Sequence, residues 1–306
     1  MNSIIRSPVA GELPFLREIW DSSFSQDDKE LFFKSYFKPD MCKIAICDGK
    51  PVCAGYLIHV GDYVSGISGA QEYPCAHIYA VATIPMYREK GFGSAVVNEL
   101  IKAGYSMGFP AIVLRPAADK LFEYYNKRSS FQEWFYVNER HFSKLSPTTS
   151  KTSEIKQISD EEYADLRSNL LSGMPHIRLN SHALAYKNNL CKLYGGGFFS
   201  LKTPDGYACA IVEVQRDGVV HVKELLSPSQ QEQAIISALA KEFRSKEYIV
   251  RTPASQAEAE IATETATDKT RFAMLAATVI AGPDPQSPSE LGRSDGIRPY
   301  AGPAFD

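Results

Sequence analysis

The sequence predicts an α/β protein built from two successive α/β units, and three features carry that prediction. An apolar segment at residues 75–83 is followed by a glycine-rich turn and then by apolar residues at helical spacing. On both sides of it, helical and strand-like segments alternate in an order typical of a sheet covered by helices. After a polar stretch at residues 145–155, a weaker form of the same order recurs.

The first half contains helical and strand-like segments around this central strand and helix. Residues 13–24 and 26–37 place apolar side chains on one helical face. Residues 41–47 and 52–64 flank the turn Asp48-Gly49-Lys50-Pro51, which is typical of a hairpin. The central helix is expected to end near residue 107, before Gly108-Phe109-Pro110. Beyond it the pattern predicts a strand at 111–114, a helix at 118–128 and an aromatic-rich strand at 131–142.

The second half is predicted as a separate unit. We expect domains at residues 1–144 and 156–306, joined by a linker at 145–155 whose composition is polar and flexible. The predicted elements of the second half are helices at 161–171, 181–190 and 230–243, and strands at 197–201, 207–213, 219–225 and 248–251. Residues 271–280 are apolar and are assigned to no element.

The turn after the central strand is suited to bind a phosphate. A helix that begins here presents free backbone N–H groups and the positive end of its dipole. Gly91 and Gly93 remove side chains, so an anion can approach the backbone, and Arg88 adds a cation. The turn is not a dinucleotide fingerprint, because Val96 stands where a third glycine is needed, and it lacks the Gly-Lys-Ser/Thr of an ATP-binding loop.

The full pattern, Val81-x-Thr83-x-Pro85-x-Tyr87-Arg88-x-x-Gly91-x-Gly93-Ser94-Ala95, resembles motif A of the GNAT superfamily of acetyl-CoA-dependent N-acyltransferases. Arg88, Gly91 and Gly93 match the core Arg/Gln-x-x-Gly-x-Gly/Ala. The resemblance covers about the first half and implies the GNAT fold, a mixed, mostly antiparallel sheet flanked by helices. The second half resembles a degenerate GNAT-like unit, since its turn at residues 225–230 has neither glycine nor arginine. Such a tandem is similar to bacterial two-unit GNAT proteins and in part to the enhanced-intracellular-survival type.

The resemblance implies acetyl-CoA (CoA) as the cofactor and assigns its contacts. Backbone groups of Val81 and Thr83 would bind the pantetheine arm and polarise the thioester. The pyrophosphate would meet the turn, which comprises Arg88, Glu89, Lys90, Gly91, Phe92, Gly93, Ser94 and Ala95. The acceptor that the resemblance implies is an amine, which we expect on a small molecule, with a protein or peptide amine as the alternative.

The resemblance also suggests catalytic residues. The segment Lys120 to Lys127 looks like motif B, where a tyrosine protonates the departing thiolate; Tyr125 is the better match and Tyr124 its neighbour. The usual Tyr-x-Lys-x-Gly-Phe ending is changed here, because the glycine is lost and one residue is added before Phe131. For the base we consider Glu72, before the central strand, and the C-terminal carboxylate at Asp306.

Composition and residue spacing also restrict the possible ligands and the location of the protein. The formal charge of −3 argues against a general nucleic-acid binder, which would be strongly basic. No apolar run is long enough to span a membrane and no secretory signal is visible, so we expect a cytoplasmic protein. The six cysteines form no Cys-x-x-Cys and the histidines show no metal spacing, so we expect reduced core cysteines and no metal. The oligomeric state is left open, a homodimer included.

Two alternatives remain beside the acetyltransferase. One is a non-catalytic protein that binds acyl-CoA as a sensor or scaffold, and the altered end of motif B motivates it. The other is an acyltransferase that uses a longer acyl group or a charged tRNA as donor. The neutral-to-acidic composition argues mildly against tRNA, because phosphate backbones call for basic surfaces.

Overall fold

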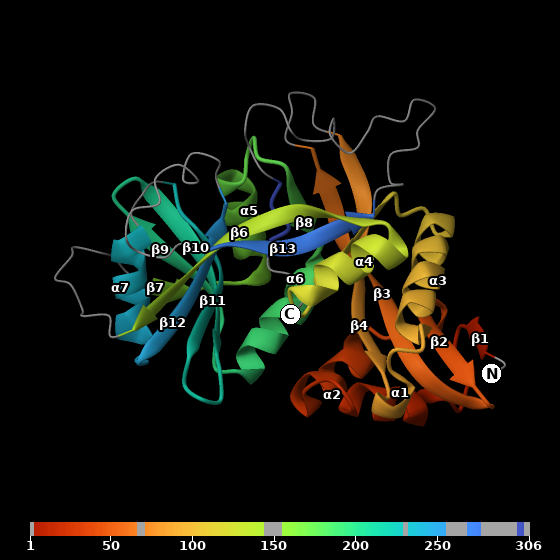
Figure 1. Ribbon diagram of the computed structural model, residues 1–306. Helices are drawn as coiled ribbons and strands as arrows, with labels where there is room; N and C mark the ends of the chain where they lie inside the picture. Colours follow the sequence, from red (N-terminus) through yellow and green to blue (C-terminus); the bar gives the residue numbers. More distant parts are fainter. Residues whose placement is uncertain are drawn as a thin grey trace.

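A computed structural model describes residues 3–65, 71–143, 155–228, 232–254, 268–276 and 299–302. Within these residues the strands form one 13-stranded sheet that runs through both halves of the molecule. Its order is β1-β2-β3-β4-β5-β13-β6-β12-β11-β10-β9-β7, with β8 attached to β3. Figure 1 shows the two halves side by side, bridged by the long strands β6 and β13.

The first half confirms the predicted helices and strands to within a few residues. Its elements are β1 (Ser3–Arg6), α1 (Leu13–Asp21), α2 (Gln26–Ser35), η1 (Pro39–Met41), β2 (Cys42–Cys47), β3 (Lys50–Val64), β4 (Glu72–Thr83), η2 (Pro85–Tyr87), α3 (Phe92–Ser106), β5 (Ala111–Leu114), α4 (Lys120–Ser129) and β6 (Phe131–Ser143). The strand β1 was not predicted. It pairs antiparallel with β2 at the edge of the sheet.

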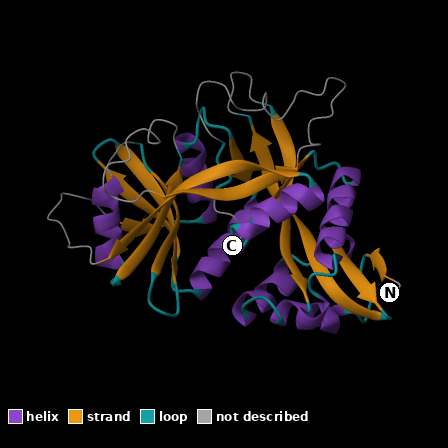
Figure 2. Cartoon of the chain, viewed as in Figure 1, coloured by secondary structure: helices purple, strands orange, loops and turns teal. Residues whose placement is uncertain are grey.

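Two cores lie on opposite faces of the first half's sheet. On one face, α3 packs Val96 and Leu100 against Ile78 of β4 and Leu114 of β5. On the other face, α1 and α2 pack a cluster around Trp20 against β3 and β4. Both α1 and α3 are amphipathic in sequence. Each helix is stabilised because its apolar face is buried against the sheet. Figure 2 shows these helices on either side of the strands.

The second half repeats helices and strands around its own core. Its elements are β7 (Ile155–Gln157), α5 (Asp160–Leu170), β8 (His176–Leu179), α6 (Ser181–Leu193), β9 (Gly197–Thr203), β10 (Gly206–Val214), β11 (Val220–Leu226), α7 (Glu232–Glu242), β12 (Glu247–Pro253) and β13 (Asp268–Ala276). The helix α7 covers one face of β9 to β12 through Ile235 and Leu239. A capping box at Ser159 and Glu162 begins α5.

Strands cross between the halves, which the predicted domain boundaries do not anticipate. The strand β13, late in the chain, lies between β5 and β6 and pairs antiparallel with both. The strand β6 in turn pairs with β12 of the second half, and β8 pairs with the end of β3. The predicted linker at residues 145–155 lies outside the described residues except for Ile155. The halves therefore share one sheet, and residues 271–276, left unassigned from sequence, form part of its centre.

The six cysteines are buried thiols in these cores, as predicted: Cys42, Cys47, Cys53, Cys75, Cys191 and Cys209. His77 is likewise buried in β4, where its ring lies 6.1 Å from that of Tyr79. None of the helices in the described part of the chain is long and apolar enough to cross a membrane.

Candidate coenzyme site

The strands β4 and β5 separate at the centre of the first half. They pair in parallel only from Cys75 with Ala111 to Ile78 with Leu114. Beyond this point β4 continues to Thr83, whereas β5 ends at Leu114. Among the described strands, none pairs with residues 79–83 on that edge. The separation leaves a stretch of β4 whose backbone can bind another chain-like molecule.

A β-bulge marks the start of the uncovered edge. On β3, Tyr56 pairs with Tyr79 and Ala54 pairs with Ala82, so two residues of β4 lie opposite one residue of β3. The extra residue brings Ala80 into the left-handed region, with φ of 48°. A bulge increases the local twist and redirects the strand, and bulges are frequent beside active sites. Here it lies directly after Ile78, where the pairing with β5 stops.

The uncovered edge carries the backbone groups of Val81 and Thr83. The N–H of Ile84 donates to the Val52 carbonyl at 3.0 Å, on the β3 side. Because backbone groups alternate between the two edges of a strand, those of Thr83 and Val81 point to the opposite side. The Thr83 carbonyl confirms this direction, since it accepts from Arg88 Nε at 3.0 Å.

The glycine turn begins α3 without a capping side chain. Gly91 is the N-cap residue, in the left-handed conformation with φ of 86°, and no side chain hydrogen-bonds to the first turn of the helix. The hydroxyl of Ser94 points back and donates to the Gly91 carbonyl at 3.0 Å. The first N–H groups of the helix are therefore left to an external acceptor, which is the arrangement that binds phosphate at helix N-termini.

Glycine is present at positions 91 and 93 of the turn for different structural reasons. Gly91 needs its left-handed φ, which disfavours any side chain. Gly93 has no such constraint, and a Cβ added there would meet only Tyr124 Oη at 3.5 Å and Thr83 Oγ1 at 3.8 Å, which are ordinary contacts. Folding therefore does not demand glycine at position 93. A small residue at this position leaves the backbone N–H groups open to a ligand, so the turn fits the predicted pyrophosphate.

The side chains of the turn differ in how far they are exposed to solvent. Phe92 is buried in the α3 core at 7 % exposure, so only its backbone could meet a ligand. Lys90 lies over the Tyr87 ring at 5.2 Å, while Glu89 is exposed with φ of 63°. Ala95 donates its N–H to Gly91 at 3.1 Å, within the helix.

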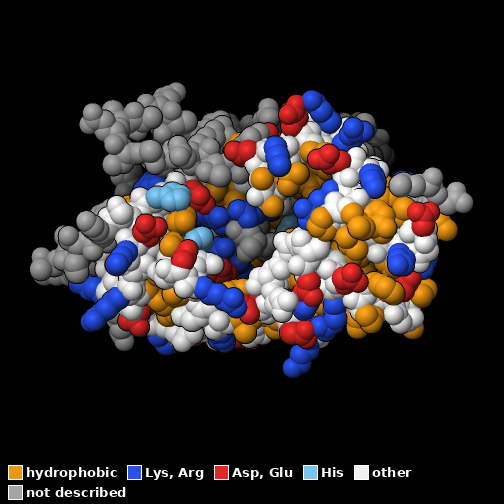
Figure 3. Space-filling model, turned by 60° about the horizontal axis from the view of Figure 1, so that its bottom comes forward, with side chains coloured by type: hydrophobic (Ala, Val, Ile, Leu, Met, Phe, Trp, Pro, Cys, Tyr) orange, Lys and Arg blue, Asp and Glu red, His pale blue; other side chains and the backbone are white. Residues whose placement is uncertain are grey.

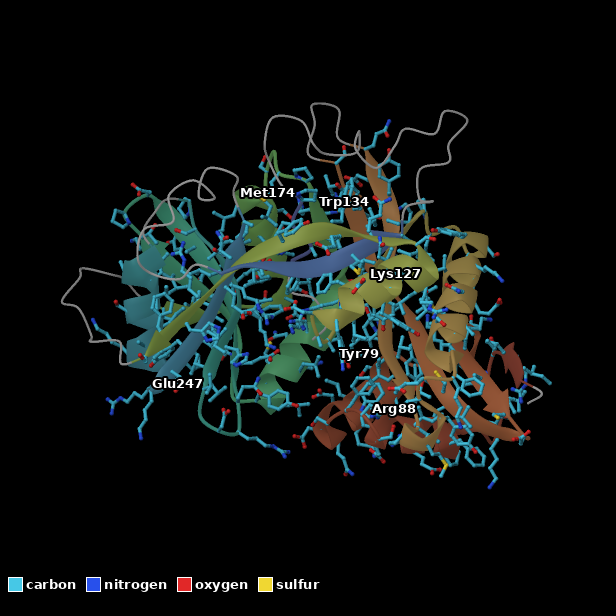
Figure 4. The ribbon with its side chains drawn as sticks, in the orientation of Figure 1. Tyr79, Arg88, Lys127, Trp134, Met174 and Glu247 are labelled. Carbon is cyan, nitrogen blue, oxygen red and sulfur yellow. The ribbon has the colours of Figure 1, made fainter. Side chains whose placement is uncertain are left out.

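Arg88 contacts the protein around the end of β4. Besides the Thr83 carbonyl, its guanidinium donates to the Ser22 carbonyl and to Ser23 Oγ, both at 3.3 Å. These partners lie at the C-terminal end of α1. Figure 4 shows Arg88 at this junction, below Tyr79 in the view. The described contacts of Arg88 thus hold the strand edge; the predicted contact with phosphate oxygens stays a prediction.

Two tyrosines of α4 lie beside the turn and the strand end. The hydroxyl of Tyr124 is the side-chain group nearest to a Cβ position at Gly93, at 3.5 Å. Tyr125 packs beside the α3 core with its ring 6.3 Å from Phe131. Burial, together with the neighbouring Tyr124 and Cys53, raises the pKa of Tyr125 above its ordinary value. Tyr125 therefore stays protonated near neutral pH and can donate a proton.

The altered end of motif B has a structural counterpart. Ser130 ends α4 in the left-handed conformation, with φ of 56°, which glycine usually supplies. In the family pattern the tyrosine precedes that glycine by four residues, and four residues before Ser130 stands Asn126. Relative to the left-handed residue that ends the helix, Tyr125 therefore stands one position earlier than the tyrosine of the family pattern. One position corresponds to about 100° around the helix. Asn126 instead donates to the Phe131 carbonyl at 2.9 Å.

Glu72 does not lie at this site. It begins the 12-residue strand β4, which ends at Thr83, and at about 3.3 Å per residue the two lie roughly 35 Å apart. Its carboxylate forms an ion pair with Arg178 of β8, with Oε1 2.7 Å from Nη1. The hydrogen bond from Arg178 lowers the pKa of Glu72. This placement argues against Glu72 as the base, because a base must reach the acceptor amine.

Asp306 lies outside the described residues, and the described chain before it comprises residues 299–302. Tyr300 forms a bridge with His176 of β8, and its carbonyl accepts from the Ile177 N–H at 3.0 Å. Tyr300 is buried beside the ion pair of Arg167 and Glu224, whose Nε and Oε2 lie 2.9 Å apart. The segment 299–302 is therefore held inside the fold, against β8 and the α5 and β11 elements.

Sequence reasoning missed residues that reach the site from elsewhere in the chain. Ser22 and Ser23 follow α1 and are joined to the turn only through Arg88. Arg115 directly follows β5, at the point where β4 and β5 separate. In the sequence, Arg115 is visible only as a single arginine after a short apolar strand. Its place at the site follows from the order of the strands in the sheet. Within the described ranges, no group of three His, Cys, Asp or Glu side chains could hold a metal ion.

This combination of separated strands, bulge and glycine turn agrees with the family match. Residues 13–127 match the acetyltransferase (GNAT) family, and they contain β4, the turn, α3 and most of α4. The chain therefore carries a GNAT-family acetyltransferase domain in its first half. A comparison with curated proteins gives no match.

Solved structures extend the GNAT fold to most of the chain. A GCN5-related N-acetyltransferase from Anabaena variabilis is 15 % identical, with 91 % of this chain and 73 % of that chain covered and a TM-score of 0.66. Eis1 from Mycobacterium abscessus is 12 % identical over 91 % and 74 % of the chains, with a TM-score of 0.62. A tandem GNAT protein from the clavulanic acid biosynthesis pathway is 11 % identical over 92 % and 100 %, with a TM-score of 0.54. At these identities the likeness concerns the fold.

Proposed function

We propose that this chain is an acetyl-CoA-dependent N-acyltransferase that moves an acetyl group to a primary amine on a small molecule. Two neighbouring features carry the proposal. One edge of β4 is not paired with another described strand at residues 79–83, and the turn that follows leads to the N-terminus of α3, which has no capping side chain. Acetyl-CoA has matching parts, an amide-containing arm that can pair with a strand edge and a pyrophosphate. Family membership of the first half supports the same assignment.

In this proposal the backbone of the first half binds and orients the coenzyme. The N–H groups of Val81 and Thr83 pair with the pantetheine arm, and the N–H groups at the start of α3 meet the pyrophosphate. The coenzyme supplies a thioester, which is an activated acyl donor. Backbone donors aimed at the thioester oxygen stabilise the negative charge that develops there during attack.

The transfer itself needs two proton movements. The amine nitrogen forms a bond with the acyl carbon and loses a proton to a base, while the carbon–sulfur bond breaks and the sulfur gains a proton. We assign the proton donor to Tyr125, the better match to the motif B tyrosine, because it packs beside the α3 core and a phenol is protonated at neutral pH. The base is a carboxylate near the acceptor; Asp306 remains the proposal, and removal of residues 303–306 should lower kcat without changing coenzyme affinity.

Calorimetric titration with acetyl-CoA tests the coenzyme site. We expect micromolar binding by the wild-type chain, no binding by Gly93→Glu, because a long anionic side chain occupies the pyrophosphate approach, and little change in Gly93→Ala, because the motif accepts alanine at this position. Gly108→Ala controls for destabilisation of α3, because φ of 85° strains any side chain there while the residue lies at the other end of the helix from the turn; its coenzyme affinity should be unchanged. Unchanged affinity in Gly93→Glu would refute the coenzyme assignment.

The alternative of a non-catalytic acyl-CoA sensor is separated from the enzyme by turnover. The enzyme should consume acetyl-CoA in the presence of a panel of primary amines and release free CoA. A sensor would bind the coenzyme with the same dependence on Gly93 and release no CoA with any amine. A donor panel with longer acyl groups tests whether acetyl is the preferred group.

A further inference from the structure

One edge of β3 has a gap between its two neighbouring strands. On this edge β2 pairs with β3 only as far as Tyr56, and β8 begins to pair with it at Gly61. Among the described strands, none covers residues 57–60 on that edge. Because β2 belongs to the first half and β8 to the second, the gap lies where the two halves meet.

A cavity of about 150 Å³ lies at this gap. The first half supplies part of its lining, namely residues 57–59 of β3 together with Tyr36 and Lys38, which follow α2. The second half supplies Asn180 and His182 at the start of α6. A ligand in this cavity would therefore contact both halves of the molecule at once.

The walls of the cavity are held in place by contacts between the halves. The carbonyl of His59 accepts from Tyr36 Oη and from Asn180 Nδ2, both at 3.1 Å. The N–H of Asn180 donates to the Val60 carbonyl at 2.9 Å, and the ring of His182 packs edge-on against that of Tyr36 at 4.3 Å. The cavity is therefore preformed, and a ligand can bind there with little reorganisation of the protein.

The ionisable residues that line the cavity are all basic. They are Lys38, His59 and His182, and no Asp or Glu lines it. Asp40, two residues after Lys38, is outside the lining, and its carboxylate accepts from the Met41 N–H at 3.1 Å. The chain as a whole has 33 Lys and Arg against 36 Asp and Glu, and Figure 3 shows both signs interspersed on the face that it presents. A lining of one sign thus differs from the general surface and favours an anion.

We propose that this cavity binds a small polyvalent oxyanion, a phosphate or a dicarboxylate, through Lys38, His59 and His182, and that the bound anion stabilises the contact between the halves. Lysine supplies a compact charge with three donors, and an imidazole supplies at least one N–H donor. The volume admits an ion of this size and is well below the roughly 300 Å³ at which pockets for larger ligands begin.

The cavity is separate from the coenzyme turn. Thr83, where the turn begins, pairs with Cys53 of β3, and His59 lies six residues further along that strand, roughly 20 Å at about 3.3 Å per residue. The proposed anion site therefore does not rest on the proposed function.

Calorimetric titration of the full-length chain with inorganic phosphate and with malonate tests the proposal. The ionic strength is held constant with sodium chloride, and the titrations are made in the Gly93→Glu variant because the wild-type coenzyme turn also suits phosphate. We expect saturable binding of one equivalent of at least one probe, and the tighter probe distinguishes a phosphate from a dicarboxylate. The bound anion should raise the midpoint of thermal unfolding by about 2 °C or more at ten times its Kd.

Substitutions in the same background link the binding to this cavity. Lys38→Met and His182→Gln should each lower the affinity at least about 10-fold, because each removes a hydrogen bond to a charged ligand. Lys38→Arg keeps the charge and should stay within about 3-fold of the parent. Lys34→Met, which removes an exposed lysine from the last turn of α2, is the matched control and should leave the affinity unchanged. Thermal unfolding without added anion shows that each variant is folded.

The outcomes separate this site from the coenzyme turn. Binding that persists in Gly93→Glu and is lost on further change of Lys38 to Met supports the cavity. Equal affinity with and without the Lys38→Met change overturns the proposal, as does the absence of saturable binding of both probes in Gly93→Glu. Binding by the wild-type chain that disappears in Gly93→Glu assigns the anion to the coenzyme turn and leaves the proposed function standing.

Discussion

Tyr124 and Tyr125 are adjacent in α4 but have different surroundings. The hydroxyl of Tyr124 is nearest to the phosphate turn, whereas Tyr125 is packed beside the core with a raised pKa. We expect Tyr125→Phe to lower kcat about 10- to 100-fold with unchanged coenzyme affinity, because general acids contribute on that order or more. Tyr124→Phe should instead weaken coenzyme binding about 3- to 10-fold. Calorimetry and steady-state kinetics on both variants check this, and the reverse pattern would exchange the two roles.

Arg88 contacts the Thr83 carbonyl and the end of α1. We expect Arg88→Ala to weaken binding of acetyl-CoA and of S-acetylpantetheine, which lacks phosphates, by the same factor of about 3 to 10, because the lost hydrogen bonds are to the protein. Lys90→Ala controls for the general loss of a cation from the same turn. If the loss appeared with acetyl-CoA alone, Arg88 would be a phosphate ligand, as the motif resemblance implies.

At the scale of single elements, β8 makes the fold sensitive to acid. His176 is 6 % exposed, and its Nδ1 lies 2.7 Å from the Met174 carbonyl. Burial, with the nearby charge of Arg167, lowers its pKa from 6.5 to about 4. The unfolded chain therefore binds this proton more readily than the folded chain, so stability is complete above pH 6.5 and falls as the pH drops toward about 4.

The resulting prediction concerns the free energy of unfolding. Between pH 7.5 and pH 5, His176 should cost the folded state about 2 kcal/mol, and His176→Gln should remove that part of the loss. Urea unfolding at both pH values measures it. His141→Gln, which removes a histidine with 67 % exposed side chain, is the control and should keep the wild-type loss. An identical pH dependence in His176→Gln and wild type would contradict the assignment.

At the scale of the whole molecule, the exchanged strands make the halves depend on each other. The strand β6 pairs with β12 and β13, and β13 also covers β5. A chain of residues 1–144 would therefore expose one edge of β5 and both edges of β6, which invites aggregation. We expect this fragment to be aggregated or unfolded by size-exclusion chromatography and circular dichroism, whereas the full chain is monodisperse. Cooperative unfolding of the fragment together with acetyl-CoA binding would show that residues 1–144 are an independent domain.

The sequence by itself determined the glycine turn and the elements that carry it. The predicted strand 75–83 and helix up to 107 agree with β4 and α3, because apolar periodicity and glycine's backbone freedom are properties of a few consecutive residues. The aromatic-rich strand at residues 131–142 and the helices α5, α6 and α7 of the second half follow from the same local rules. The GNAT resemblance rests on this stretch, and the family match covers it.

Only the tertiary structure decided what depends on contacts between distant residues. Glu72, at the end of β4 remote from the turn, pairs with Arg178, 106 residues away, and Arg251 of β12 pairs with Glu139 of β6, 112 residues away. The strand β13 lies in the centre of the sheet because β5 and β6 leave an edge that only a third strand can pair. Such pairings are set by which backbone edges and charges remain unsatisfied after the local elements form, and no short stretch of sequence contains that information.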